Sequence, residues 1–118
     1  MASLYDRLGG TDGITKIAND VVELHMKNPR IAPRFAGRDL AVLKKSAAAF
    51  FITGTGGPSV YEGKDMRSAH KGMNIDHAEF MAVLDDALEA LQKHGIGRRE
   101  QEEVLFVLYS MRGEIVRV

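Results

Sequence analysis

The chain has 118 residues, of which 45% are hydrophobic and 27% are charged, a composition typical of a single globular domain spanning residues 1–118. Its 16 basic residues balance its 16 acidic residues, which argues against electrostatic binding to nucleic acid or to a membrane surface. The absence of cysteine excludes disulfides, thiolate-bound zinc, iron–sulfur clusters and cysteine nucleophiles.

The N-terminal part of the chain predicts a short turn followed by a long helix. Residues 4–8 form a short amphipathic segment that a glycine pair, Gly9 and Gly10, closes with a left-handed helix end or a tight bend. A helix is expected from Asp12 to Asn28, because apolar residues recur there at three- and four-residue steps. Pro29 ends it, since the residue before a proline is disfavoured in helical conformation. The stripe along this helix consists of Ile14, Ile17, Ala18, Val21, Leu24 and His25.

The middle of the chain predicts a second helix and then a long connection. Asp39 is a suitable N-cap for this helix. The glycine-rich segment 54–59 has no helical pattern, and it begins a long connection around residues 54–69. A connection of this length in a small domain usually serves a function or is mobile, and it leads here to His70. The expected inner face of the second helix consists of Leu40, Leu43, Ala47, Phe50 and Phe51.

The last third of the chain predicts two further helices. Asp76 and Glu79 form a capping box, with Asp in place of the usual Ser or Thr. The helix that follows has a regular apolar stripe and is closed by Gly95. A final helix is expected to start near Arg98 and to carry apolar residues as far as Ile115. Alternating strand patterns are not evident, so the predicted fold class is all-α, with four substantial helices.

Among the residues of this pattern, His70 is the clearest candidate for a chemical role. It lies at the end of a polar segment, between stretches that are expected to form apolar helices. A neutral imidazole nitrogen is a good ligand for haem iron, and a single axial histidine leaves the opposite face of the iron open. The spacing alone also permits an ordinary surface or capping histidine.

Short motifs along the chain carry a family resemblance. They are Leu-Tyr-Asp-Arg-Leu-Gly-Gly at 4–10, Ile-Ala-Pro-Arg-Phe-Ala at 31–36, Ala-Phe-Phe at 49–51, Gly-Gly-Pro at 56–58, Tyr-Glu-Gly at 61–63, Met-Arg-Ser-Ala-His at 66–70 and Met-Arg-Gly-Glu-Ile-Val at 111–116. In this order and at these spacings, the chain resembles the truncated hemoglobins of group I over nearly its whole length.

The resemblance implies a two-over-two helical sandwich around haem b. It makes His70 the axial ligand of the iron. The other haem contacts that it implies are Phe35 and Phe50 on the ring, Tyr61 near the propionates, and Met66 and Phe80 on the pocket walls.

The chemistry of haem, an apolar plate with charged edges, agrees with these assignments. Such a plate needs an apolar slot and hydrogen-bond donors at its rim. We expect Lys64 and Arg67 to supply the donors. The apolar slot is expected to be formed by Phe50, Phe51, Val83, Leu84 and Val107.

The expected gas-binding face departs from the family. Val22 takes the place of the usual tyrosine, and Leu43, Ser46 and Ala47 cannot close the sixth iron position. Bound oxygen carries partial negative charge, and losing one donor costs on the order of 1–3 kcal/mol, roughly a five- to hundred-fold change in an equilibrium constant. We therefore expect bound oxygen to leave quickly unless Ser46 or a water donates.

Two neighbouring residues bear on this apolar face. His25 could lean toward the pocket, but we expect it to cover the end of its helix near solvent, because Pro29 ends the helix shortly afterwards. Lys45 is expected to point outward, given the helical phase of its apolar neighbours.

Three classes of function remain open. The favoured one is a monomeric haem protein that reversibly binds diatomic gases (O₂, CO and NO). The second is a nitric oxide dioxygenase or an electron-transfer haem enzyme, either of which needs a reductase partner. The third is a cofactor-free helical interaction module. The N-terminus lacks the apolar segment of a signal peptide, and no apolar run is long enough to span a bilayer, so we expect a cytoplasmic location.

Overall fold

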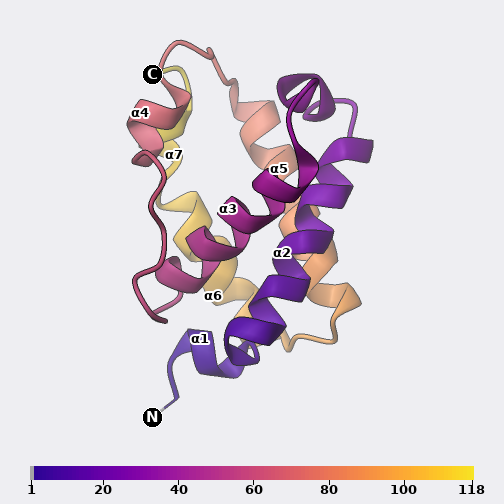
Figure 1. Ribbon diagram of the computed structural model, residues 1–118, viewed down its shortest axis with the longest axis vertical. Coiled ribbons are helices and arrows are strands. Elements are labelled where there is room, and N and C mark those ends of the chain that lie inside the picture. The colour runs from indigo at the N-terminus through magenta and orange to yellow at the C-terminus, as the bar shows by residue number, and fades with distance from the viewer. Residues whose placement is uncertain (1) are drawn as a thin grey trace.

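The computed structural model describes residues 2–118, and the regular secondary structure in that range is entirely helical (Figure 1). No helix in this range is long and apolar enough to cross a membrane. The elements are α1 (Leu4–Arg7), α2 (Gly10–Lys27), the 3₁₀ helix η1 (Ala32–Phe35), α3 (Leu40–Gly54), α4 (Met66–His70), α5 (His77–Lys93), α6 (Arg98–Tyr109) and α7 (Arg112–Ile115).

The helix ends follow the local signals in the sequence. The Asp39 carboxylate accepts a hydrogen bond from the Ala41 N–H at 2.9 Å, which caps α3. The Asp76 carboxylate accepts from the Glu79 N–H at 2.7 Å, and the reciprocal bond completes the predicted capping box of α5. These bonds satisfy donors that the first turn of a helix leaves free.

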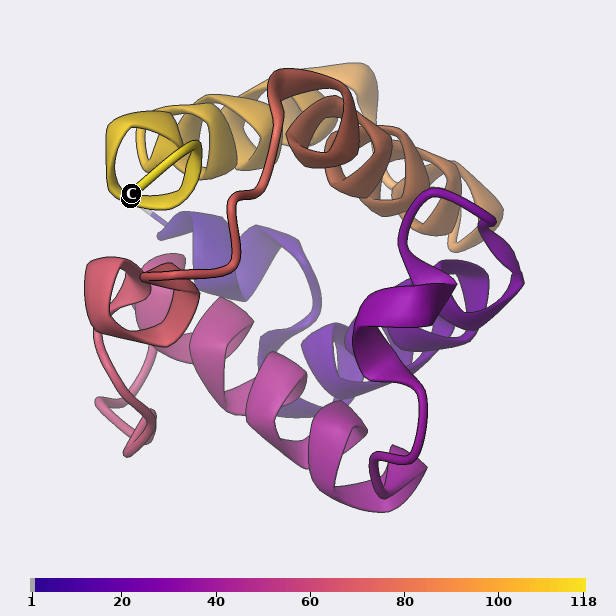
Figure 2. The ribbon, with the colours of Figure 1, turned by 90° about the horizontal axis from the view of Figure 1, so that it is seen from above.

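The helices form two layers. Figure 2 shows α2 and α3 in one layer and α5 and α6 in the other, with α4 at one side of the sandwich. The core between them includes Ile14, Ile52, Leu84, Leu91 and Val104, each less than a tenth exposed. The predicted all-α, two-over-two arrangement is confirmed.

Two predicted features of the helices are wrong. The expected final helix is broken, because α6 ends at Tyr109 and a separate short helix, α7, packs against α4. Leu40 was expected on the inner face of α3, yet it is 39% exposed. Periodicity identifies the apolar face of a helix, but it does not show whether the opposite layer covers the helix end. Leu40 is the first residue of α3 and lies at such an end.

Candidate functional site

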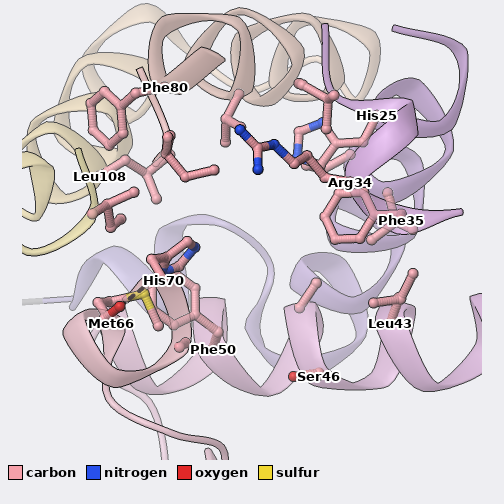
Figure 3. A pocket seen from close by; sticks show the side chains of 18 of the residues that line it. His25, Arg34, Phe35, Leu43, Ser46, Phe50, Met66, His70, Phe80 and Leu108 are labelled. Atoms are coloured by element: carbon pink, nitrogen blue, oxygen red, sulfur yellow. Dashed lines mark hydrogen bonds between the residues drawn. The ribbon is translucent and has the colours of Figure 1, made fainter. Parts of the chain in front are cut away.

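A cavity of about 380 Å³ lies between the two layers (Figure 3). Its walls are mostly apolar, as expected of a site for a large flat cofactor. The structure brings together nearly all of the predicted site residues around it: Val22, Phe35, Leu43, Ser46, Ala47, Phe50, Tyr61, Met66, His70, Phe80 and Leu84.

Three of the residues expected to help form the site do not line this cavity. Lys64 and Arg67 are exposed and lie outside the lining, so their contact with haem propionates stays a prediction. Val107 was expected in the apolar slot together with Val83 and Phe51, which do line it; the neighbouring Leu108 takes its place. One position along a helix turns a side chain by about 100°, so the phase of α6 decides between these two residues.

His70 presents a free imidazole nitrogen at the cavity. Its Nδ1 lies 2.8 Å from the Met66 carbonyl oxygen, which accepts the Nδ1 hydrogen when the ring is neutral. The other nitrogen, Nε2, has no hydrogen-bond partner within residues 2–118 and carries the lone pair. A metal-binding imidazole is typically held in this way, with one ring nitrogen anchored and the other free for the metal. The donor set therefore fits haem iron.

The short helix α4 positions this imidazole. Asp65 caps the helix by accepting a hydrogen bond from the Ser68 N–H at 3.0 Å. A single helical turn is enough to place the Met66 carbonyl one turn before His70, because residues four apart lie on the same face. The sequence analysis expected a long connection around residues 54–69, and it missed the short helix that begins within it at Met66.

The segment before α4 is tied to α3 by Tyr61. Its ring packs edge-on against Phe50, with centroids 5.7 Å apart. Its hydroxyl donates to the Lys64 carbonyl at 2.7 Å, and the Thr53 hydroxyl accepts its backbone N–H at 3.0 Å. Tyr61 thus holds the loop against the cavity wall.

The part of the lining formed by α2 and α3 is largely apolar, as predicted. Val22 is buried, Leu43 and Ala47 are half-buried, and Ser46 is exposed; all four line the cavity. Lys45 is exposed and does not line the cavity, which confirms that it points outward.

His25 is the main correction to the sequence interpretation. It was expected near solvent, but it is only 8% exposed and lines the cavity. Its Nδ1 lies 2.7 Å from Asp86 Oδ2, and its ring is parallel to that of Phe35, with centroids 6.2 Å apart. The packing of α5 against α2 covers the end of α2. This burial lowers the pKa of His25, and Asp86 partly offsets the effect.

Arg34 is a cavity residue that the sequence interpretation overlooked. Its guanidinium makes paired hydrogen bonds of 2.7 and 2.9 Å to Glu79 and donates to the Met73 carbonyl at 2.7 Å. This joins η1 to α5 and to the loop after α4, and it holds the pKa of Glu79 below its usual range. The only local signal was an arginine placed between Pro33 and Phe35 in a compact apolar connection.

A helical sandwich that encloses a mostly apolar cavity lined by His70 is the architecture expected of a truncated globin. The family model described as bacterial-like globin matches residues 3–117. The chain therefore belongs to the bacterial-like globin family, and this membership implies haem binding.

Individual relatives agree with the family match. A group 1 truncated hemoglobin of Synechocystis is 34% identical over 102 residues, which cover 81% of each chain. One from Nostoc is 28% identical over 116 residues, 98% of each chain. The crystal structure of the Fe(III) form of truncated hemoglobin from Tetrahymena pyriformis superimposes with a TM-score of 0.95 at 25% identity, covering 99% of this chain and all of that one. The predicted resemblance to group I truncated hemoglobins is confirmed.

Proposed function

We propose that this protein binds haem b, with His70 Nε2 holding the iron, and that the haem-loaded protein reversibly binds O₂, CO and NO. The observation that carries the proposal is the His70 side chain, anchored through Nδ1 to the Met66 carbonyl with its other nitrogen free at an apolar cavity. When bound, haem supplies the iron position at which a diatomic gas binds.

The chain itself supplies the slot and the selectivity. Phe35 and Phe50 offer aromatic surface to the ring, and the apolar walls keep water away from the iron. Val22 offers no hydrogen bond to the gas, so a ligand that gains negative charge on binding is held weakly. Carbon monoxide, which is less polar when bound, is affected less.

Reconstitution with hemin tests the proposal. The wild-type protein is expected to give a strong Soret band, and His70→Gly is expected to lose the axial ligand and to regain a similar spectrum when free imidazole is added. His77→Ala is the matched control, because this exposed histidine begins α5 outside the cavity. A colourless folded protein, or an unchanged spectrum in His70→Gly, would refute haem ligation by His70.

Gas binding is tested on the ferrous protein. Repeated oxygenation and removal of oxygen, followed by absorption, is expected to be reversible, with rapid oxygen release. Consumption of nitric oxide in the presence of oxygen and a reductant would instead favour the dioxygenase alternative, which needs a reductase partner.

A further inference from the structure

A second imidazole, that of His25, belongs to the cavity. His25 comes from α2, whereas His70 comes from α4. Figure 3 shows His25 beside Arg34 and Phe35, across the cavity from His70 and Met66. The cavity therefore holds one histidine more than axial ligation of the iron by His70 requires.

The contacts of His25 determine which of its nitrogens is free. The Asp86 carboxylate, itself held by Asn28 Nδ2 at 3.2 Å, accepts the hydrogen of the His25 Nδ1 at 2.7 Å. The neutral ring then carries its lone pair on Nε2. Within residues 2–118, no fully buried side-chain nitrogen or oxygen lacks a partner, and His25 Nε2 makes no hydrogen bond. Since His25 lines the cavity and is nearly buried, Nε2 opens into the cavity.

Burial and the Asp86 carboxylate act in opposite directions on the basicity of His25. Burial lowers the pKa of His25, so the ring is neutral at neutral pH and can accept a proton. Once protonated, the imidazolium is stabilised by Asp86 and by its place in the last turn of α2, where the helix dipole favours a cation.

The other charged groups that line the cavity are less suited to this role. Arg34 is paired with Glu79, and Arg38, although exposed, is a cation that accepts no proton. His70 has the iron as its proposed partner, and α3 contributes no charged residue to the lining.

We propose that His25 Nε2 accepts the proton of weak-acid ligands HX, such as hydrogen cyanide or hydrogen sulfide, when they bind the ferric protein. The inference rests on the proposed haem site. The H–X bond would break, the proton would move to Nε2 directly or through one water, and the bonding pair would stay on X⁻, which would bind the iron without any change of oxidation state. An apolar cavity admits neutral HX more readily than the anion, and the retained proton balances the anionic charge.

Proton release on cyanide binding tests the proposal. The haem-loaded ferric protein is mixed with hydrogen cyanide at neutral pH in weakly buffered solution that contains a pH indicator. The wild-type protein is expected to bind cyanide without releasing a proton. The variants His25→Gln and His25→Leu are expected to release a proton for each cyanide bound, because they hold no base. Asp86→Asn is expected to release a larger fraction of a proton for each cyanide bound than the wild-type protein, since it lacks the carboxylate that stabilises the imidazolium.

A matched control is available in a second His–Asp pair, which is half-buried. His94 Nε2 lies 2.6 Å from Asp20 Oδ2, and neither residue lines the cavity, so His94→Gln is expected to behave as wild type. The rate of cyanide association is expected to fall by about 10²-fold in His25→Gln. The rate of carbon monoxide binding to the ferrous protein, which involves no proton, is expected to stay nearly unchanged.

The outcomes separate this proposal from the haem site on which it rests. Proton release by the wild-type protein, or the same behaviour in wild type and His25→Gln, overturns the role of His25. Failure of the wild-type protein to form a Soret band overturns the haem site itself. The wild-type measurement is decisive even if His25→Leu does not fold.

Discussion

Gly13 is a glycine within α2 at which helix propensity and tertiary packing predict opposite effects of an alanine substitution. Propensity alone predicts that Gly13→Ala stabilises the helix by up to about 1 kcal/mol. A Cβ built at Gly13, however, would lie 2.5 Å from the Leu8 carbonyl oxygen and 3.4 Å from the Leu8 carbonyl carbon. The clashing atom belongs to the backbone at the end of α1 and cannot swing aside as a flexible side chain does.

The size of the change in the free energy of unfolding follows from these two opposed effects. Overpacking in a well-packed site costs typically about 1–3 kcal/mol, and a Cβ only 2.5 Å from a backbone oxygen belongs at the upper end of that range. Subtracting the propensity gain of up to about 1 kcal/mol leaves a net loss of about 2 kcal/mol. The α1 segment is also held by the ion pairs of Arg7 with Glu100 and Glu103 on α6, which limit how far it can retreat. We therefore expect the free energy of unfolding to fall.

Equilibrium unfolding in urea measures this change. With a slope of about 1–3 kcal/mol/M for a small protein, a loss of about 2 kcal/mol corresponds to a fall in the midpoint by roughly 0.7–2 M. Gly113→Ala is the control, because a Cβ at this helical glycine of α7 meets nothing within 4 Å, and it is expected to be neutral or slightly stabilising. A Gly13→Ala protein as stable as wild type would show that α1 does not pack as described.

Three further predictions concern the cavity and the core. Val22→Tyr places a donor in the cavity lining and is expected to slow oxygen release roughly five- to hundred-fold; stopped-flow displacement by CO measures this, and the same slowing in Val22→Phe would exclude the hydroxyl as its cause. Arg34 lowers the pKa of Glu79, so this pair stabilises the fold above the ordinary pKa of a glutamate, and the contribution is lost as the pH falls through the lowered pKa. Glu79→Gln is therefore expected to be less stable than wild type at neutral pH and to lose less stability on acidification. Urea unfolding at several pH values measures this, and the same pH dependence of the free energy of unfolding in both proteins would contradict the pairing. Leu91→Ala removes a side chain that is 2% exposed and is expected to cost about 2–5 kcal/mol, measured by thermal or urea unfolding; a loss below 1 kcal/mol would be inconsistent with its burial.

Local sequence signals predicted the features that depend on neighbours along the chain. The caps at Asp39 and Asp76 and the end of α2 before Pro29 were correct, because each depends on hydrogen bonds or steric clashes within a few residues. The motif that ends in His70 supplied both the candidate ligand and, four residues earlier, the Met66 carbonyl that anchors it.

The features that sequence reasoning missed depend on contacts between distant segments. The burial of His25 comes from Asp86, 61 residues further along the chain, and the inward position of Arg34 comes from Glu79, 45 residues away. The choice of Leu108 over Val107 depends on how α6 is rotated against the rest of the sandwich. Periodicity within one helix carries no information about any of these partners.

The sequence by itself determined an all-helical chain and a candidate iron ligand, His70, because periodicity, caps and motif spacing act over short ranges. Tertiary packing alone decided the polarity of the cavity, since it buries a second histidine and brings an ion-paired arginine into the lining beside the apolar residues that the sequence had placed there. Burial and pairing of a charged group are properties of the space between elements, and only the folded arrangement defines that space.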